Sequence, residues 1–114
     1  MNEIFDKVGA MERVGEDVEL LNELVDICQT EYVDKIVQLR AAVQEGNVKT
    51  VTDLSHSLKG AFGNVGSKLG HQSAFELEQA GKKGNTPQLQ KLLSQMERAV
   101  GEFFITYAEE KKKL

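Results

Sequence analysis

His56 is the side chain best placed to do chemistry, because helical geometry turns it away from an apolar stripe. At about 100° per residue, the nearby apolar residues fall on the opposite face of a helix. That stripe consists of Val51, Leu54, Leu58, Ala61, Phe62 and Val65. We therefore expect the imidazole to face solvent. An exposed imidazole carries a free lone pair for much of the time near neutral pH, and in that state it can attack phosphorus as a nucleophile.

The same predicted face carries cations and glycines in place of bulky side chains. Lys59 follows His56 by three residues, where helical neighbours have Cβ atoms about 5–6 Å apart. Its ammonium would disfavour a protonated His56, and its flexible stem could reach a phosphoryl group on the ring. Gly60 and Gly63 each cost a helix about 0.5–1 kcal/mol relative to alanine, and their missing side chains would leave access for a partner's reactive carboxylate. Two further candidate docking residues complete this face, Lys49 and Thr52.

The run His-Ser-Leu-Lys-Gly at residues 56–60 resembles the motif of histidine-containing phosphotransfer (HPt) domains. The resemblance continues through Ala61 and Gly66 and covers about residues 15 to 82. It includes residues 17–21 and 46–47, Ala42, Leu77 and Glu78. It implies that His56 is the phosphoryl acceptor, that Lys59 stabilises the phosphate, and that Gly60 lets a receiver domain dock. Two positions depart from the family pattern, Ser55 where alanine is common and Gly70 where a leucine usually packs.

A reaction follows from this resemblance. It implies reversible phosphoryl transfer between the phosphoaspartate of a receiver domain and His56, by in-line attack of the distal ring nitrogen, Nε2. The chain has no glycine-rich phosphate loop of the Walker type and no kinase-like nucleotide motif, so we expect no ATP binding. We expect no cofactor, because the magnesium ion would belong to the receiver. The chain would then be a phosphorelay intermediate and not an enzyme.

Two alternative functions use the same residues. In the first, the protein is a docking bundle that binds or sequesters a response regulator without carrying phosphate. In the second, it is a structural bundle in which His56 is incidental, as most solitary exposed histidines are. Both are disfavoured by the presence of His56 and Lys59 together, since neither docking nor structure needs a nucleophile beside a phosphate-binding cation.

The remaining candidates for chemistry are interpreted as structural. His71 lacks the ligand spacing of a metal site, so no metal is expected. Cys28 lies on an apolar stripe and is predicted to fill the core. Lys82 and Lys83 are assigned to a solvated loop, with a minor chance of contact with an acidic partner.

Composition limits the function classes further. A chain of 114 residues is long enough for one domain with a continuous core, taken here as residues 1–114. The net charge of −4, from 14 Lys+Arg and 18 Asp+Glu, argues against nucleic-acid binding. One cysteine, no signal-peptide pattern and no apolar run of about 18 residues favour a cytoplasmic protein that does not enter a membrane. We expect a monomer whose partners are receiver domains of response regulators or hybrid histidine kinases.

The elements that must position these residues are all helical, because no segment alternates with the period of a strand. We expect an antiparallel up-down four-helix bundle with a short additional N-terminal helix as a lid on one end. The short helix is predicted over residues 2–10, and the four long ones over 17–46, 47–65, 67–80 and 86 to near the C-terminus, with a loop at 81–85. A break near residues 29–30 is left open. The predicted N-caps are Asp17, Asn47 and Thr86, the last followed by Pro87 at the first helical position, and Ser67 is expected to open the helix over 67–80.

Overall fold

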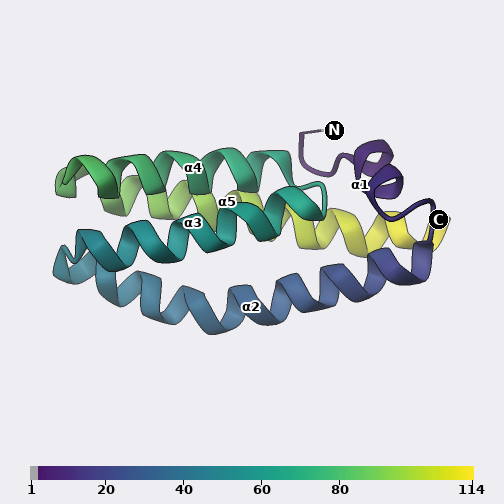
Figure 1. Ribbon diagram of the computed structural model, residues 1–114, viewed down its shortest axis with the longest axis horizontal. Coiled ribbons are helices and arrows are strands. Elements are labelled where there is room, and N and C mark those ends of the chain that lie inside the picture. The colour runs from purple at the N-terminus through teal and green to yellow at the C-terminus, as the bar shows by residue number, and fades with distance from the viewer. Residues whose placement is uncertain (1–2) are drawn as a thin grey trace.

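The computed structural model describes residues 3–114, which form an all-helical fold (Figure 1). These residues contain five α-helices and no strand, so the predicted all-α class is confirmed. The helices are α1 (Lys7–Arg13), α2 (Val18–Glu45), α3 (Val48–Asn64), α4 (Lys68–Lys83) and α5 (Thr86–Glu110), followed by the 3-10 turn η1 (Lys111–Lys113). None of the helices in this range is long and apolar enough to cross a membrane.

The four long helices lie side by side along the 42 Å axis of the molecule (Figure 1). α3 packs against α2 and α4, α4 packs against α5, and α5 returns against α2. The most extensive contact joins α3 and α4. α2 and α5 extend beyond the other two, and α1 and the C-terminus lie at that end of the molecule (Figure 1).

The core forms where the apolar stripes of these helices meet. Phe62 and Leu58 of α3 and Phe103 of α5 are fully buried, as the helical period predicts. Cys28 is also buried, and desolvation, with a smaller contribution from the charge of Glu31, raises the pKa of its thiol to about 12. The prediction that Cys28 is a core residue is therefore confirmed.

Side-chain caps fix the starts of α2 and α3 as predicted. The Asp17 carboxylate accepts a hydrogen bond of 3.1 Å from the backbone N–H of Leu20. The Asn47 side chain accepts one of 3.2 Å from the N–H of Thr50. Gly46 ends α2 in the left-handed conformation, with φ of 68°. Between these points α2 is one continuous helix, so no break occurs near residues 29–30.

The N-terminal helix differs from its prediction. α1 begins at Lys7, because the Asp6 carboxylate caps it by accepting a hydrogen bond of 3.1 Å from the N–H of Gly9. Phe5 precedes the helix and is buried, with its ring centroid 5.7 Å from that of Phe103. Asn2, where the predicted helix starts, lies outside the described residues. The short helix therefore lies about one turn later than the apolar pattern indicated.

The loop predicted at residues 81–85 is wrong. α4 continues to Lys83 and ends at Gly84, which has φ of 68° and whose N–H bonds the carbonyl of Gly81 at 3.1 Å. Gly81 lies within the helix and is buried against α3. The N-cap position of α5 is Asn85, one residue before the predicted Thr86. Gly81 was interpreted as a helix end, whereas it lies inside α4 and permits a close contact with α3.

Candidate functional site

His56 lies in the middle of α3 on the face opposite the core. Its side chain is 68% exposed, whereas Val51, Leu58 and Phe62 on the other face of the helix are fully buried. The predicted exposure of the imidazole is confirmed. The neighbouring helix α4 supplies the group that pairs with the His56 ring.

α3 and α4 meet along a seam of matched residues that runs past His56. Thr52 of α3 contacts Gly81 of α4, and His56 is paired with Glu78. One turn further along α3, the ring of Phe75 lies against Lys59, with Nζ 5.5 Å from its centroid. Along the seam, residue numbers rise on α3 as they fall on α4, so the two helices are antiparallel in this region. The seam brings residues that are 22 positions apart in the chain into direct contact.

Glu78 is the central residue of the site. It is almost completely buried, with only 1% of its surface exposed. Its Oε2 atom lies 2.8 Å from Nδ1 of His56 and 3.5 Å from Nζ of Lys82. Its other oxygen, Oε1, lies 2.8 Å from Nζ of Lys59. One buried carboxylate therefore joins the histidine to two lysines, and we call these four residues the Glu78 cluster.

Glu78 is ionised at neutral pH despite its burial. Desolvation acts to raise its pKa, but hydrogen bonds from Lys59 and His56 and the charges of Lys59 and Lys82 outweigh it and lower the pKa from 4.5 to about 2. A carboxylate only accepts hydrogen bonds, so Nδ1 of His56 must carry the proton that it donates. The neutral ring then has its lone pair on Nε2.

Gly60 and Gly63 differ in what surrounds them. A Cβ atom added to Gly60 would meet nothing within 4 Å. A Cβ atom on Gly63 would lie 3.0 Å from Nδ1 of His71, which is itself 3.0 Å from the carbonyl oxygen of Lys59. The prediction that both glycines leave open surface is right for Gly60 and wrong for Gly63, because a side chain from α4 fills the second space.

A family comparison agrees with this arrangement. The family model of the Hpt domain matches residues 23–103, a range that contains the whole Glu78 cluster. The chain belongs to the Hpt domain family.

This Hpt domain is also similar to a solved structure. The crystal structure of histidine-containing phosphotransfer protein B (HptB) from Pseudomonas aeruginosa PAO1 superposes on it with a TM-score of 0.74 and 25% sequence identity. The match covers 94% of this chain and 90% of that chain. A comparison with curated proteins finds no match.

The remaining predicted docking residues, Lys49 and Thr52, both precede His56 on α3. Lys49 is 84% exposed and forms an ion pair of 2.8 Å with Asp53 one turn later. The Thr52 hydroxyl donates a hydrogen bond of 2.7 Å to the carbonyl of Val48 and is half-buried in the seam. Lys49 is therefore open to a partner, whereas the Thr52 hydroxyl is already bonded within the Hpt domain.

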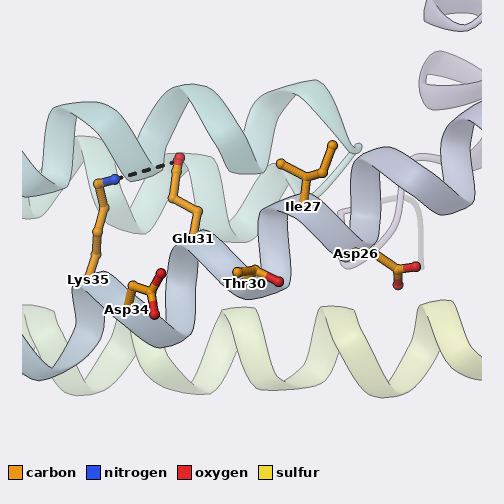
Figure 2. Close-up of a pocket in the computed structure, with 6 residues that line it drawn as sticks. All are labelled: Asp26, Ile27, Thr30, Glu31, Asp34 and Lys35. Atoms are coloured by element: carbon orange, nitrogen blue, oxygen red, sulfur yellow. Dashed lines mark ion pairs between the residues drawn. The ribbon is translucent and has the colours of Figure 1, made fainter.

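Two hollows lie along α2. The first, of about 370 Å³, runs between α2 and α3 and reaches Gly60 and Ser57, with Leu24 and Ile27 on its other side. The second, of about 460 Å³, lies on α2 itself (Figure 2). It is lined by Asp26, Ile27, Thr30, Glu31, Asp34 and Lys35, of which Glu31 and Lys35 form an ion pair of 3.9 Å. Only the first hollow adjoins the helix face that carries His56. No group of three or more metal-ligating side chains converges within residues 3–114.

Sequence reasoning assigned no chemical role to Glu78 or Lys82. A signal for Glu78 was present, because it falls on the buried stripe of α4 formed by residues 74, 77, 78 and 81. A carboxylate on a buried stripe needs a cation or a hydrogen-bond donor from a neighbouring helix. The sequence of α4 alone does not indicate which helix supplies that donor. Lys82 was missed because residues 81–85 were predicted as a loop, whereas Lys82 lies in α4.

Proposed function

We propose that this Hpt domain is a histidine phosphotransfer protein of a two-component phosphorelay, in which His56 exchanges a phosphoryl group with the aspartate of a receiver domain. The observation that carries the proposal is the pairing of exposed His56 with buried Glu78. It directs Nδ1 into the protein and leaves Nε2 for an incoming phosphoryl group. Lys59 on the same carboxylate brings a cation to the same place.

The transfer step is a displacement at phosphorus. The Nε2 lone pair of His56 attacks the phosphorus of the aspartyl phosphate, and the bond from phosphorus to the aspartate oxygen breaks. The aspartate leaves as a carboxylate with the electron pair, and the imidazole ring gains a positive charge while Nδ1 keeps its proton. Glu78, ionised and 2.8 Å from Nδ1, stabilises that charge. The reverse step returns the phosphoryl group to an aspartate.

The other predicted site residues have supporting roles in this proposal. Lys59 stabilises the phosphoryl oxygens, and Gly60 leaves a bare surface on which a receiver can dock beside His56. Lys49 and the hollow between α2 and α3 extend that docking surface. The magnesium ion belongs to the receiver, so the Hpt domain acts as a phosphoryl carrier without a cofactor or nucleotide of its own.

The same proposal includes the setting of the protein. The ring of contacts among the four long helices supports an antiparallel four-helix bundle with an additional N-terminal helix. We propose that it acts as a monomer in the cytoplasm, with receiver domains of response regulators or hybrid histidine kinases as partners. A docking bundle that sequesters a regulator is the alternative, and it requires no phosphoryl transfer.

Transfer from a phosphorylated receiver tests the proposal directly. We expect the label to appear on His56, to be lost in acid and to survive base, as for a phosphoramidate. His56→Gln should abolish it, whereas His71→Gln should leave it unchanged. Incubation with ATP and magnesium alone should give no label. Tight binding of receivers without any label would favour the sequestering alternative, and a label on His71 would refute the assignment.

A further inference from the structure

Lys82 lies in the site although its sequence position suggested a loop. It is in the last turn of α4, and its Nζ is 3.5 Å from Oε2 of Glu78, the oxygen that also holds Nδ1 of His56. Its side chain is 54% exposed, whereas that of Lys59 is 21% exposed. Lys82 is therefore the more exposed of the two cations on this carboxylate.

The two lysines flank His56 along the seam. Lys82 follows Gly81, which contacts Thr52 one turn before His56, whereas Lys59 is one turn after it. They also bind different oxygens of Glu78, with Lys59 on Oε1 and Lys82 on Oε2. The two ammonium groups thus reach the Glu78 cluster from opposite ends of the seam.

The charge balance of the cluster changes when a phosphoryl group arrives. With a neutral ring, two ammonium groups face one carboxylate, so one positive charge is in excess. A phosphoryl group on Nε2 brings close to two negative charges. With the positive charge of the ring counted, the excess positive charge then falls to about zero, and the ionised Glu78 repels the phosphoryl oxygens. A cation that moves from the carboxylate to the phosphoryl group would relieve this repulsion. Lys82 is the more exposed of the two lysines, so its movement requires less desolvation.

We propose that Lys82 is a second cation for the phosphoryl group on His56, held on Glu78 until that group arrives. The inference rests on the proposed phosphotransfer function and deepens it. No bond to Lys82 forms or breaks in the step. Its ammonium exchanges a carboxylate oxygen for phosphoryl oxygens while Nε2 takes up phosphorus and the donor's leaving group departs. Lys82 thereby raises the stability of phosphorylated His56 relative to the phosphorylated donor.

The test compares Lys82→Gln with Lys83→Gln, a matched pair of adjacent lysines in the last turn of α4. Residues 3–114 contain no ion pair of Lys83, which makes it the control for the loss of one charge. Phosphoramidate serves as the donor because it is too small to need a docking surface, and ammonia is its leaving group. We expect Lys82→Gln to lower the equilibrium fraction of phosphorylated His56 by about three- to tenfold, and Lys83→Gln to leave it unchanged. Lys82→Arg should restore most of the loss.

A double-variant experiment separates this role from a structural one. In Glu78→Gln the charge that holds Lys82 is absent, so Lys82 is free to bind the phosphoryl group from the start. If Lys82 acts on the phosphoryl group, Lys82→Gln still lowers the phosphorylated fraction in the Glu78→Gln background. If Lys82 only helps Glu78 to orient His56, the second substitution has no further effect. Helical content and thermal unfolding of each variant show that it is folded.

Three results would overturn the inference. The first is an equal phosphorylated fraction in Lys82→Gln and Lys83→Gln. The second is a loss with a receiver donor and none with phosphoramidate, which would make Lys82 a docking residue. The third is the absence of a further effect in the Glu78→Gln background. If the parent protein takes no label from either donor, the proposed function itself is refuted. That result is distinguishable from a refutation of the role of Lys82 alone, in which the parent protein is still labelled.

Discussion

Glu78→Gln should make the stability of this Hpt domain less sensitive to acid. The Glu78 carboxyl has a pKa of about 2 in the folded protein against 4.5 as the ordinary value, and one pKa unit corresponds to about 1.36 kcal/mol. Because the folded-state pKa is the lower one, the stabilisation is present above the ordinary pKa and is lost as the pH falls toward about 2. The full contribution is about 3 kcal/mol, of which about 2 kcal/mol is lost by pH 3.

Urea unfolding at pH 7 and at pH 3 measures this contribution. Other carboxyl groups also titrate in this range, so the quantity of interest is the difference between the parent and Glu78→Gln in the free energy of unfolding lost on acidification. We expect the parent to lose about 2 kcal/mol more than the variant. Glu76→Gln, which removes an exposed carboxylate from the same helix, is the matched control and should follow the parent.

The reasoning fails if the parent and Glu78→Gln lose the same free energy between the two pH values. That result would mean that Glu78 is not held ionised by Lys59 and His56 in the folded protein. The tautomer assigned to His56 would then lose its basis, because a protonated Glu78 could donate its own hydrogen to Nδ1. Nitrogen chemical shifts of the His56 ring would report that change directly.

Three further predictions follow from the surroundings of single residues. Gly60→Ala should raise the free energy of unfolding by up to about 1 kcal/mol, whereas Gly81→Ala should lower it by about 1–3 kcal/mol, because its Cβ would press on Thr52 and on backbone atoms of α3. Thermal and urea unfolding compare the two, and equal effects would contradict the reasoning. Gly60→Gln should slow transfer from a receiver much more than labelling by phosphoramidate; an equal loss with both donors would show that Gly60 protects the chemistry or the local helix geometry, and equal retention with both would show that the bare face is not a docking site. Ser55→Ala should leave stability unchanged or raise it by up to about 1 kcal/mol, because the buried Ser55 hydroxyl has no hydrogen-bond partner within residues 3–114, and a clear loss in urea unfolding would show that a bond exists.

The features that depend on one helix alone could be predicted from the sequence. The exposure of His56 follows from the helical period, because the buried Leu58 and Phe62 lie on the other face of α3. At the N-caps, the side chains of Asp17 and Asn47 accept hydrogen bonds from backbone N–H groups only three residues later. Such contacts are encoded locally, and tertiary packing does not have to be known.

The features that were missed involve a second helix. Glu78 could be recognised as an acid on a buried stripe, but its pairing with His56 depends on the register of α3 against α4. The space beside Gly63 is filled by His71, which the sequence of α3 cannot indicate. Gly81 was interpreted as a terminator because glycine is common at helix ends, although here it serves a close helix contact.

The glycines of α3 and α4 explain how that register is held. Gly81 admits the side chain of Thr52 at one end of the site, and Gly63 admits the ring of His71 at the other. Near the start of α4, a Cβ atom on Gly70 would lie 3.3 Å from the ring of Phe62, so its absence also lets the two helices approach. A shift of one residue would turn either helix by about 100° and remove all of these fits at once. The contacts on both sides of the site therefore keep the carboxylate of α4 beneath the imidazole of α3. Among these four glycines only Gly60 meets nothing within 4 Å in the described part of the chain, which agrees with the proposal that it leaves access to His56.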